Sequence, residues 1–163
     1  MRKKSINISF IFILIDQIIK LIINNSLLYG EDISLIHNFL YLTNAHNFGA
    51  AWSTFSGARY LLIIIAILTF VFLTYYENDF KYKTRTMIGF SLVYGGLFGN
   101  LIDRFVLGYV VDYIGIILYK YYFPIFNFAD MCLVVGFILI IIAILKGEDK
   151  NDNKKSKRKN KNR

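Results

Sequence analysis

Four long apolar runs, separated by polar segments, dominate the pattern of the chain. They cover residues 6–25, 60–76, 87–106 and 126–145. A helix rises about 1.5 Å per residue, so each run is long enough to cross, or nearly cross, a hydrocarbon layer about 30 Å thick. The pattern therefore predicts an all-α membrane protein with four transmembrane helices.

The composition excludes a water-soluble domain. Hydrophobic residues make up 56% of the 163 positions and charged residues only 18%, and the mean hydropathy is +0.47. A soluble domain carries about 25% charged residues and divides its apolar residues among shorter amphipathic segments. The single cysteine, Cys132, excludes an intrachain disulfide and an all-cysteine metal site.

Basic residues are distributed unevenly around the four runs, and this predicts the orientation. All but four of the 19 Lys and Arg residues precede the first run, lie between the second and third, or follow the fourth. The exceptions are Lys20, inside the first run, and Arg59, Arg104 and Lys120 on the opposite side. Cytoplasmic loops are enriched in Lys and Arg, so both termini are expected in the cytoplasm and residues 26–59 and 107–125 outside.

The outer segment 26–59 alternates apolar and polar residues in part, around Ile33, Leu35, Phe39, Tyr41 and Leu42. Alternation with a period of two is typical of a half-buried strand. We therefore expect a small β-containing region on the outer surface of the membrane.

The chain is expected to divide into a membrane domain at residues 1–149 and a basic tail at residues 150–163. The tail is rich in Lys, Asn and Arg, which favours a disordered cytoplasmic anchor on anionic membrane lipid over nucleic-acid binding. At the other end, a basic start precedes the first run, as in a signal peptide. Because Asp16 and Lys20 interrupt this run and no small-residue cleavage site follows, we expect a retained helix.

Polar residues occupy positions in these runs where apolar residues are expected. They are Asp16 and Gln17 in the first run, Asn100, Asp103 and Arg104 at the end of the third, and Asn127 and Asp130 at the start of the fourth. Ionisable residues in membrane helices cost a few kcal/mol each, so they usually mark a functional site or a structural pairing. The predicted topology allows Asp103, Asp112 and Asp130 to converge at the outer surface.

Small residues form a stripe along the third run. Ser91, Gly95, Gly99 and Asp103 recur every four positions, which places them on one helix face and predicts close packing against another helix. Asp103 and Arg104 are expected to form a structural tie at the helix end. Asp16 fits either a buried polar tie between helices or a role in a site.

Asp112 and Asp130 differ from the other acids because no basic residue is close to them in the sequence. The nearest are Arg104 and Lys120, eight to ten positions away. Two carboxylates held together without cations cannot both ionise easily, so one pKa rises and the pair can share a proton. In aspartyl proteolysis the ionised acid activates a water, and the protonated acid donates to the carbonyl oxygen and the leaving amine. Packing or proton transfer would also explain the pair.

Five segments, taken in order, match the motifs of a known family. They are Asp16-Gln17, Asn47-Phe48-Gly49-Ala50-Ala51-Trp52-Ser53, Gly95-Gly96-Leu97-Phe98-Gly99-Asn100-Leu101-Ile102-Asp103-Arg104, Val110-Val111-Asp112-Tyr113 and Phe126-Asn127-Phe128-Ala129-Asp130. With the four-helix layout, and over about residues 16–145, the chain resembles lipoprotein signal peptidase, the type II signal peptidase of bacteria. One such motif is weak, whereas five in order are highly specific.

The resemblance implies an aspartyl endopeptidase of the bacterial cytoplasmic (inner) membrane, with its active site at the outer face. Its substrates would be diacylglyceryl-modified prolipoproteins, cut just before the lipidated cysteine. The catalytic pair would fall on Asp112 and Asp130, and the other motif positions on Asp16, Asn47, Gly99, Asn100, Asp103, Arg104 and Asn127. No cofactor, metal ion or nucleic acid is implied.

Three asparagines have expected roles. Asn47 is expected either to donate hydrogen bonds to the substrate backbone or to serve as a turn residue. Asn100 and Asn127 are expected to orient the acids. The sequence departs from the family pattern at Tyr113, where Phe is commoner, and after Asp130, where Met131 and Cys132 replace an expected small polar residue. Cys132 is expected to pack as a small apolar residue.

Two other function classes fit parts of the pattern. A small membrane transport or proton-conducting protein also has acids in its helices, but spreads them through the depth of the bilayer. An assembly subunit would use the glycine stripe to bind a partner helix and would leave Asp112 and Asp130 without a role. The gathering of acids at one surface favours the peptidase.

Overall fold

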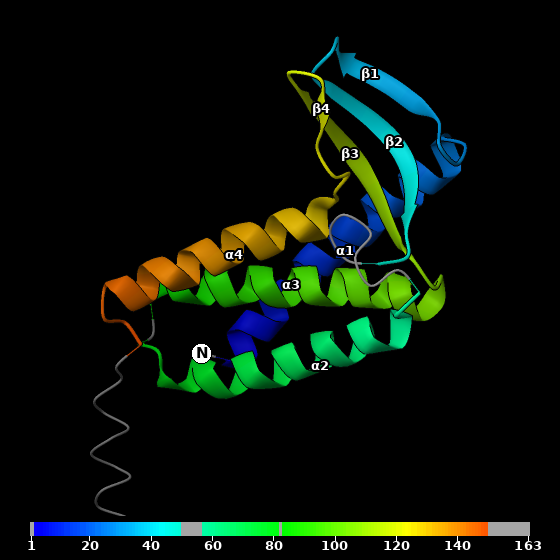
Figure 1. The fold of residues 1–163 in the computed structure, drawn as a ribbon. Coiled ribbons are helices and arrows are strands. Elements are labelled where there is room, and N and C mark those ends of the chain that lie inside the picture. The colour runs from blue at the N-terminus through cyan, green and yellow to red at the C-terminus, as the bar shows by residue number, and fades with distance from the viewer. Residues whose placement is uncertain (1, 50–56, 82, 150–163) are drawn as a thin grey trace, which may run out of the picture.

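Helices and one small sheet form the part of the chain that the computed structural model describes, residues 2–49, 57–81 and 83–149. The helices are α1 (Arg2–Ser26), α2 (Arg59–Tyr76), the short 3-10 helix η2 (Glu77–Asp79), α3 (Thr84–Val106) and α4 (Phe128–Leu145). The strands are β1 (Asp32–Ile36), β2 (Leu40–Asn47), β3 (Val110–Leu118) and β4 (Tyr121–Tyr122). The sheet lies at the end of the helices where α3 finishes and α4 begins (Figure 1).

Three of the described helices are long and apolar enough to cross a membrane. They are α1, the stretch Arg59–Asp79 that contains α2, and α4. Large apolar side chains on these helices, such as Phe10, Leu68 and Ile138, are exposed on the protein surface. Such a surface is stable in lipid and unfavourable in water. The four predicted helices are therefore present, and three of them meet the requirements of a span.

The more polar sequence of α3 follows from its central position. This helix packs against α1, α2 and α4, and it has more buried residues than any of those three helices. A helix surrounded by other helices presents little surface to lipid, so it tolerates glycine and polar residues. This position explains why α3 is less apolar than its neighbours.

The glycine stripe of α3 brings it close to α1, as the spacing predicts. A Cβ atom added to Gly95 would lie only 2.6 Å from the Cβ of Phe12 on α1. On a neighbouring face, a Cβ at Gly96 would clash with the backbone oxygen of Ala129 on α4. Glycine at these positions therefore sets the distance between α3 and both partner helices.

The sheet makes the prediction of an all-α protein incomplete. Its strands are antiparallel and ordered β1-β2-β3-β4. β1 and β2 confirm the strand structure expected in residues 26–59. β3 and β4 were not predicted, because β3 is a nearly continuous apolar run without the alternation of a half-buried strand.

One bridge between the sheet and α4 positions the acids. Phe126, just before α4, pairs with Ile114 of β3. The Ile114 backbone nitrogen donates to the Phe126 oxygen at 2.8 Å, and the Phe126 nitrogen donates back to the Ile114 oxygen at 3.0 Å. The first turn of α4, which carries Asp130, is thereby held beside the part of β3 that carries Asp112.

Candidate active site

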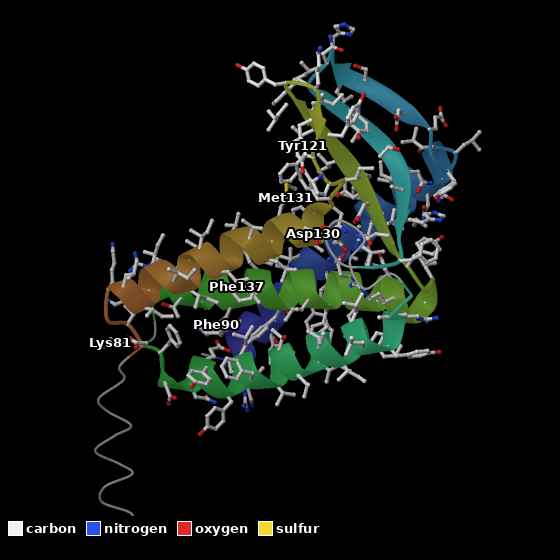
Figure 2. All side chains as sticks on the ribbon, viewed as in Figure 1. Lys81, Phe90, Tyr121, Asp130, Met131 and Phe137 are labelled. Carbon is white, nitrogen blue, oxygen red and sulfur yellow. The ribbon has the colours of Figure 1, made fainter. Side chains whose placement is uncertain are left out.

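The predicted polar residues meet where the helices join the sheet. In Figure 2 Asp130 lies at this junction, whereas Lys81 lies at the opposite end of the helices. The junction holds residues from α1, α3, α4, β2 and β3. Its polar side chains are Asp16, Lys20, Asn47, Asn100, Asp103, Arg104, Asp112, Asn127 and Asp130.

Asp112 is buried and accepts two amide hydrogen bonds. The Nδ2 atom of Asn47, on the neighbouring strand, donates to Oδ2 at 2.8 Å, and the Nδ2 atom of Asn127 donates to Oδ1 at 2.6 Å. Burial raises the pKa of the Asp112 carboxyl to about 7, and the negative charge of Asp130 adds to the rise. Asp112 is therefore partly protonated near neutral pH.

Asp130 lies in the first turn of α4 and takes part in a capping box. Its Oδ2 atom accepts from the Asn127 backbone nitrogen at 3.1 Å, while its own backbone nitrogen donates to Asn127 Oδ1 at 3.0 Å. Its Oδ1 atom accepts from Asn100 Nδ2 at 2.8 Å. The carboxylate therefore lies at a helix N-terminus, and it is close enough to Arg104 for their charges to interact.

A chain of two asparagines connects the acids. Asn127 Nδ2, which donates to Asp112, also faces Asn100 Oδ1 at 3.1 Å, and the other end of the Asn100 amide donates to Asp130. These are the contacts expected of groups that orient the two carboxyls. Asn127 is fully buried, so bulk water does not compete for its hydrogen bonds.

Asp103 pairs with Lys20 and not with its neighbour Arg104. The Lys20 Nζ atom lies 2.9 Å from Asp103 Oδ2 and 2.8 Å from Asp16 Oδ2. The predicted tie between Asp103 and Arg104 is therefore not the contact that the structure shows. Adjacent helix residues do not face each other, and Arg104 instead donates to the backbone oxygens of Asn100 at 3.3 Å and Gly49 at 3.0 Å.

Asp16 connects α1 to α4 and lies against Gly99 of α3. In addition to Lys20, its Oδ1 atom accepts from the backbone nitrogen of Ala129 in α4 at 3.0 Å. A Cβ on Gly99 of α3 would lie 2.5 Å from Asp16 Oδ2, so the glycine leaves the space for this carboxylate. Of the two interpretations of Asp16, the structure supports the buried polar tie.

Asn47 holds Asp112 and also shapes its own turn. Its Nδ2 atom donates to Asp112, and its Oδ1 atom accepts from the Gly49 backbone nitrogen at 2.9 Å. Of the two expected roles, the contact with the Gly49 nitrogen agrees with that of a turn residue. The Asn47 Nδ2 atom also contacts Asp112, which was not expected. The rest of this motif, residues 50–53, lies outside the described residues.

A cavity of about 690 Å³ opens beside the acids. Asp112, Asp130, Asn47, Asn100 and Arg104 supply its polar wall. The remaining wall is apolar and comes mostly from residues 123–126 and from α4. Among the described residues, no group of three or more His, Cys, Asp and Glu side chains is placed to bind a metal ion. The arrangement suits acid–base chemistry on a ligand with a large apolar part.

Sequence reasoning missed Lys20 as a member of this site. The residue is 2% exposed and contacts Asp16, Asp103 and Asn100. The available signal was its spacing of four from Asp16 inside a membrane helix, which places both side chains on one face. The sequence predicted the helix that contains Lys20, but it did not predict that Lys20 contacts Asn100 and Asp103 of α3.

Comparison with known proteins decides the family. The family described as Signal peptidase (SPase) II matches residues 8–146. The chain belongs to the signal peptidase II family. Lipoprotein signal peptidases from two strains of Staphylococcus aureus, bovine RF122 / ET3-1 and JH9, are 41% and 40% identical to it over 154 residues. Each alignment covers 94% of this chain and 93% of the relative.

Solved structures agree with this placement in the signal peptidase II family. Two bacterial membrane enzymes, determined by the in meso method at 2.3 Å and 1.9 Å resolution, superpose with TM-scores of 0.79 and 0.77. Both are 40% identical to this chain and cover 87% of it. The overlap covers 87% and 92% of the two solved chains. The membrane-enzyme fold, with apolar helices and a small antiparallel sheet, is thereby confirmed.

Proposed function

We propose that this signal peptidase II is the aspartyl endopeptidase that removes the signal peptide from diacylglyceryl-modified prolipoproteins, with Asp112 and Asp130 as its catalytic pair. Membership of the family supports the reaction. The observation that carries the residue assignment is that both carboxyls face one cavity and are connected by Asn100 and Asn127. Conduction or transport is not favoured.

The environments of the two acids support different roles in the reaction. Asp130, at a helix N-terminus and near Arg104, is the base that takes a proton from the attacking water. Asp112, whose pKa is raised to about 7, is the acid that protonates the carbonyl oxygen. The proton gained by Asp130 then passes to the leaving amine, and Asp112 takes back a proton from a hydroxyl of the tetrahedral intermediate as its C–N bond breaks, so the pair returns to its starting charge.

The apolar part of the cavity supports a lipid-bearing substrate. Phe123, Met131 and Val134 are among the apolar residues that line it, so the acyl chains would lie against α4 while the scissile bond faces the acids. Each buried methylene contributes about 0.8 kcal/mol. The diacylglyceryl group therefore holds the peptide at the depth of the catalytic pair.

The distribution of basic residues supports an inner-membrane topology with both termini in the cytoplasm and the acids at the outer face. In this arrangement α3 crosses the membrane as the fourth span, surrounded by α1, α2 and α4. The sheet, whose strands β2 and β3 contribute Asn47 and Asp112 to the cavity wall, then lies at the outer surface. The tail at residues 150–163, outside the described residues, would contact anionic lipid on the cytoplasmic side.

Purified protein in detergent, incubated with a diacylglyceryl-modified prolipoprotein, tests this function directly. We expect a single cut immediately before the lipidated cysteine, located by mass spectrometry. The unmodified precursor serves as the matched control and should be cut at least about tenfold more slowly, since it lacks the lipid that orients the scissile bond. Equal rates would argue for a membrane aspartyl protease without lipoprotein specificity, and no cut would argue against the peptidase.

A further inference from the structure

We propose that Lys20 is a positioning residue for this reaction, which acts by fixing the direction of the Asn100 amide between the two catalytic acids. The inference rests on the proposed function of Asp112 and Asp130. Lys20 is 2% exposed and is not among the residues that line the cavity. Its effect on the reaction must therefore pass through the side chains that it contacts.

The chemistry of the lysine ammonium determines which end of Asn100 faces Asp130. An ammonium group donates hydrogen bonds and accepts none. The Lys20 Nζ atom lies 3.0 Å from Asn100 Oδ1, so the amide oxygen must face Lys20. The amide nitrogen then faces Asp130, to which it donates at 2.8 Å.

Asn127 extends this oriented hydrogen-bond chain to the second acid, Asp112. The amide oxygen of Asn127 accepts from the Asp130 backbone nitrogen, so its nitrogen faces Asp112 and the Asn100 oxygen. The Asn100 oxygen thus accepts from both Lys20 and Asn127. Without Lys20 this oxygen loses its charged donor and keeps only Asn127, so the Asn100 amide is held less firmly between the two acids.

Two buried carboxylates keep Lys20 in place. Asp16 on α1 and Asp103 on α3 both lie within 3 Å of its Nζ atom, and Gln17 Nε2 donates to Asp103 Oδ1 at 2.9 Å. Asp16, Lys20 and Asp103 do not line the cavity, so their ion pairs do not contact the substrate directly. Asp16 and Asp103 hold the ammonium, and the ammonium orients the amide.

The test compares Lys20→Met with Lys81→Met, the same change at the opposite end of the helices. We expect Lys20→Met to lower kcat about 100-fold on the lipidated substrate and to change KM less than about twofold, because Lys20 does not line the cavity. Lys81→Met should leave both constants unchanged. Near-normal kcat in folded Lys20→Met would overturn the inference.

A double-mutant cycle with Asn100→Leu separates positioning from support of the fold. If Lys20 acts through Asn100, Lys20→Met should cost no more than about threefold in kcat once Asn100 is already replaced. Independent, multiplicative losses would contradict the proposed route. The cycle remains informative even if both single variants lose some thermal stability, since each kcat is normalised to folded protein.

A further pair of variants covers the case in which Lys20→Met folds poorly. Lys20→Met combined with Asp16→Asn or Asp103→Asn removes one of the two carboxylates that contact Lys20 and restores the net charge of the cluster. Each double variant should regain thermal stability while kcat stays low. Recovery of kcat together with stability would show that Lys20 only neutralises the buried carboxylates, and it would overturn the inference. Asp112→Asn and Asp130→Asn belong in the same assay. If these two variants cleave normally, the assignment of the catalytic pair is wrong. If they lose cleavage while Lys20→Met keeps a normal kcat, only the inference about Lys20 is wrong.

Discussion

At the scale of single residues, the contrast between Asp112 and Asp130 predicts how the reaction depends on pH. Burial and the charge of Asp130 raise the pKa of Asp112 to about 7. Because Asp112 must be protonated to donate, kcat/KM should fall as pH rises through about 7, approaching tenfold per unit above it. A pH profile on the lipidated substrate measures this. A rate that stays level up to pH 9 would contradict the role of Asp112 as the acid.

Asp103 has a structural role and should respond differently from the catalytic pair. Asp103→Asn removes one of the two carboxylates that hold Lys20, which should destabilise the protein by on the order of 3 kcal/mol. Cleavage should be reduced but present in the folded fraction, since Asp16 still contacts Lys20. Thermal unfolding and turnover are measured together. A fully stable, inactive Asp103→Asn protein would place Asp103 in the chemical machinery.

Much of this site could be predicted residue by residue because its motifs are local. Asn127 and Asp130 form a capping box within four positions, and their mutual contacts follow from helix geometry. Lys20 and Asp103 are 83 positions apart in the chain, and nothing in their local sequence indicates that they meet. Asp103 beside Arg104 suggested the wrong partner, because adjacency in sequence is not adjacency on a helix.

At the scale of elements, the packing of α3 against α4 sets the position of Asp130. A side chain at Gly96 would clash with the backbone oxygen of Ala129, one residue before Asp130. Gly96→Ala should therefore destabilise the protein by about 1–3 kcal/mol and lower kcat. Val71→Ala, at a position 56% exposed on α2, is the control and should do neither. Unchanged stability and turnover in Gly96→Ala would contradict the claim that close packing of α3 against α4 sets the position of Asp130.

The elements also show where sequence patterns are informative. The four helices were predicted within a few residues, since long apolar runs have few alternatives in a membrane. β1 and β2 followed from partial alternation. β3 was not distinguished from a loop, because its first four residues, Val110 to Tyr113, are all buried and include Asp112. A strand buried on both faces lacks the period of two that identifies strands in a sequence.

At the scale of the whole molecule, the topology predicts which positions an impermeant reagent can reach. Single cysteines at positions 30 and 119, placed after Cys132→Ala, should be labelled in intact cells, because both positions belong to the outer region. A cysteine at position 78, in the short helix η2 between α2 and α3, should be labelled only after the membrane is opened. Labelling of position 78 but not position 30 would reverse the orientation and move the acids to the cytoplasmic face.

Cleavage by Asp112→Asn and Asp130→Asn in the lipidated-prolipoprotein assay tests the catalytic pair most directly. An amide can neither take a proton from water nor share one with its partner, so each variant should lose about 10²- to 10⁴-fold in kcat. Membrane insertion should remain intact, which fractionation of the membranes verifies. Loss of cleavage in both variants, with the protein still inserted, is the result that we predict. Near-normal cleavage by either variant would contradict the assignment of Asp112 and Asp130 as the catalytic pair.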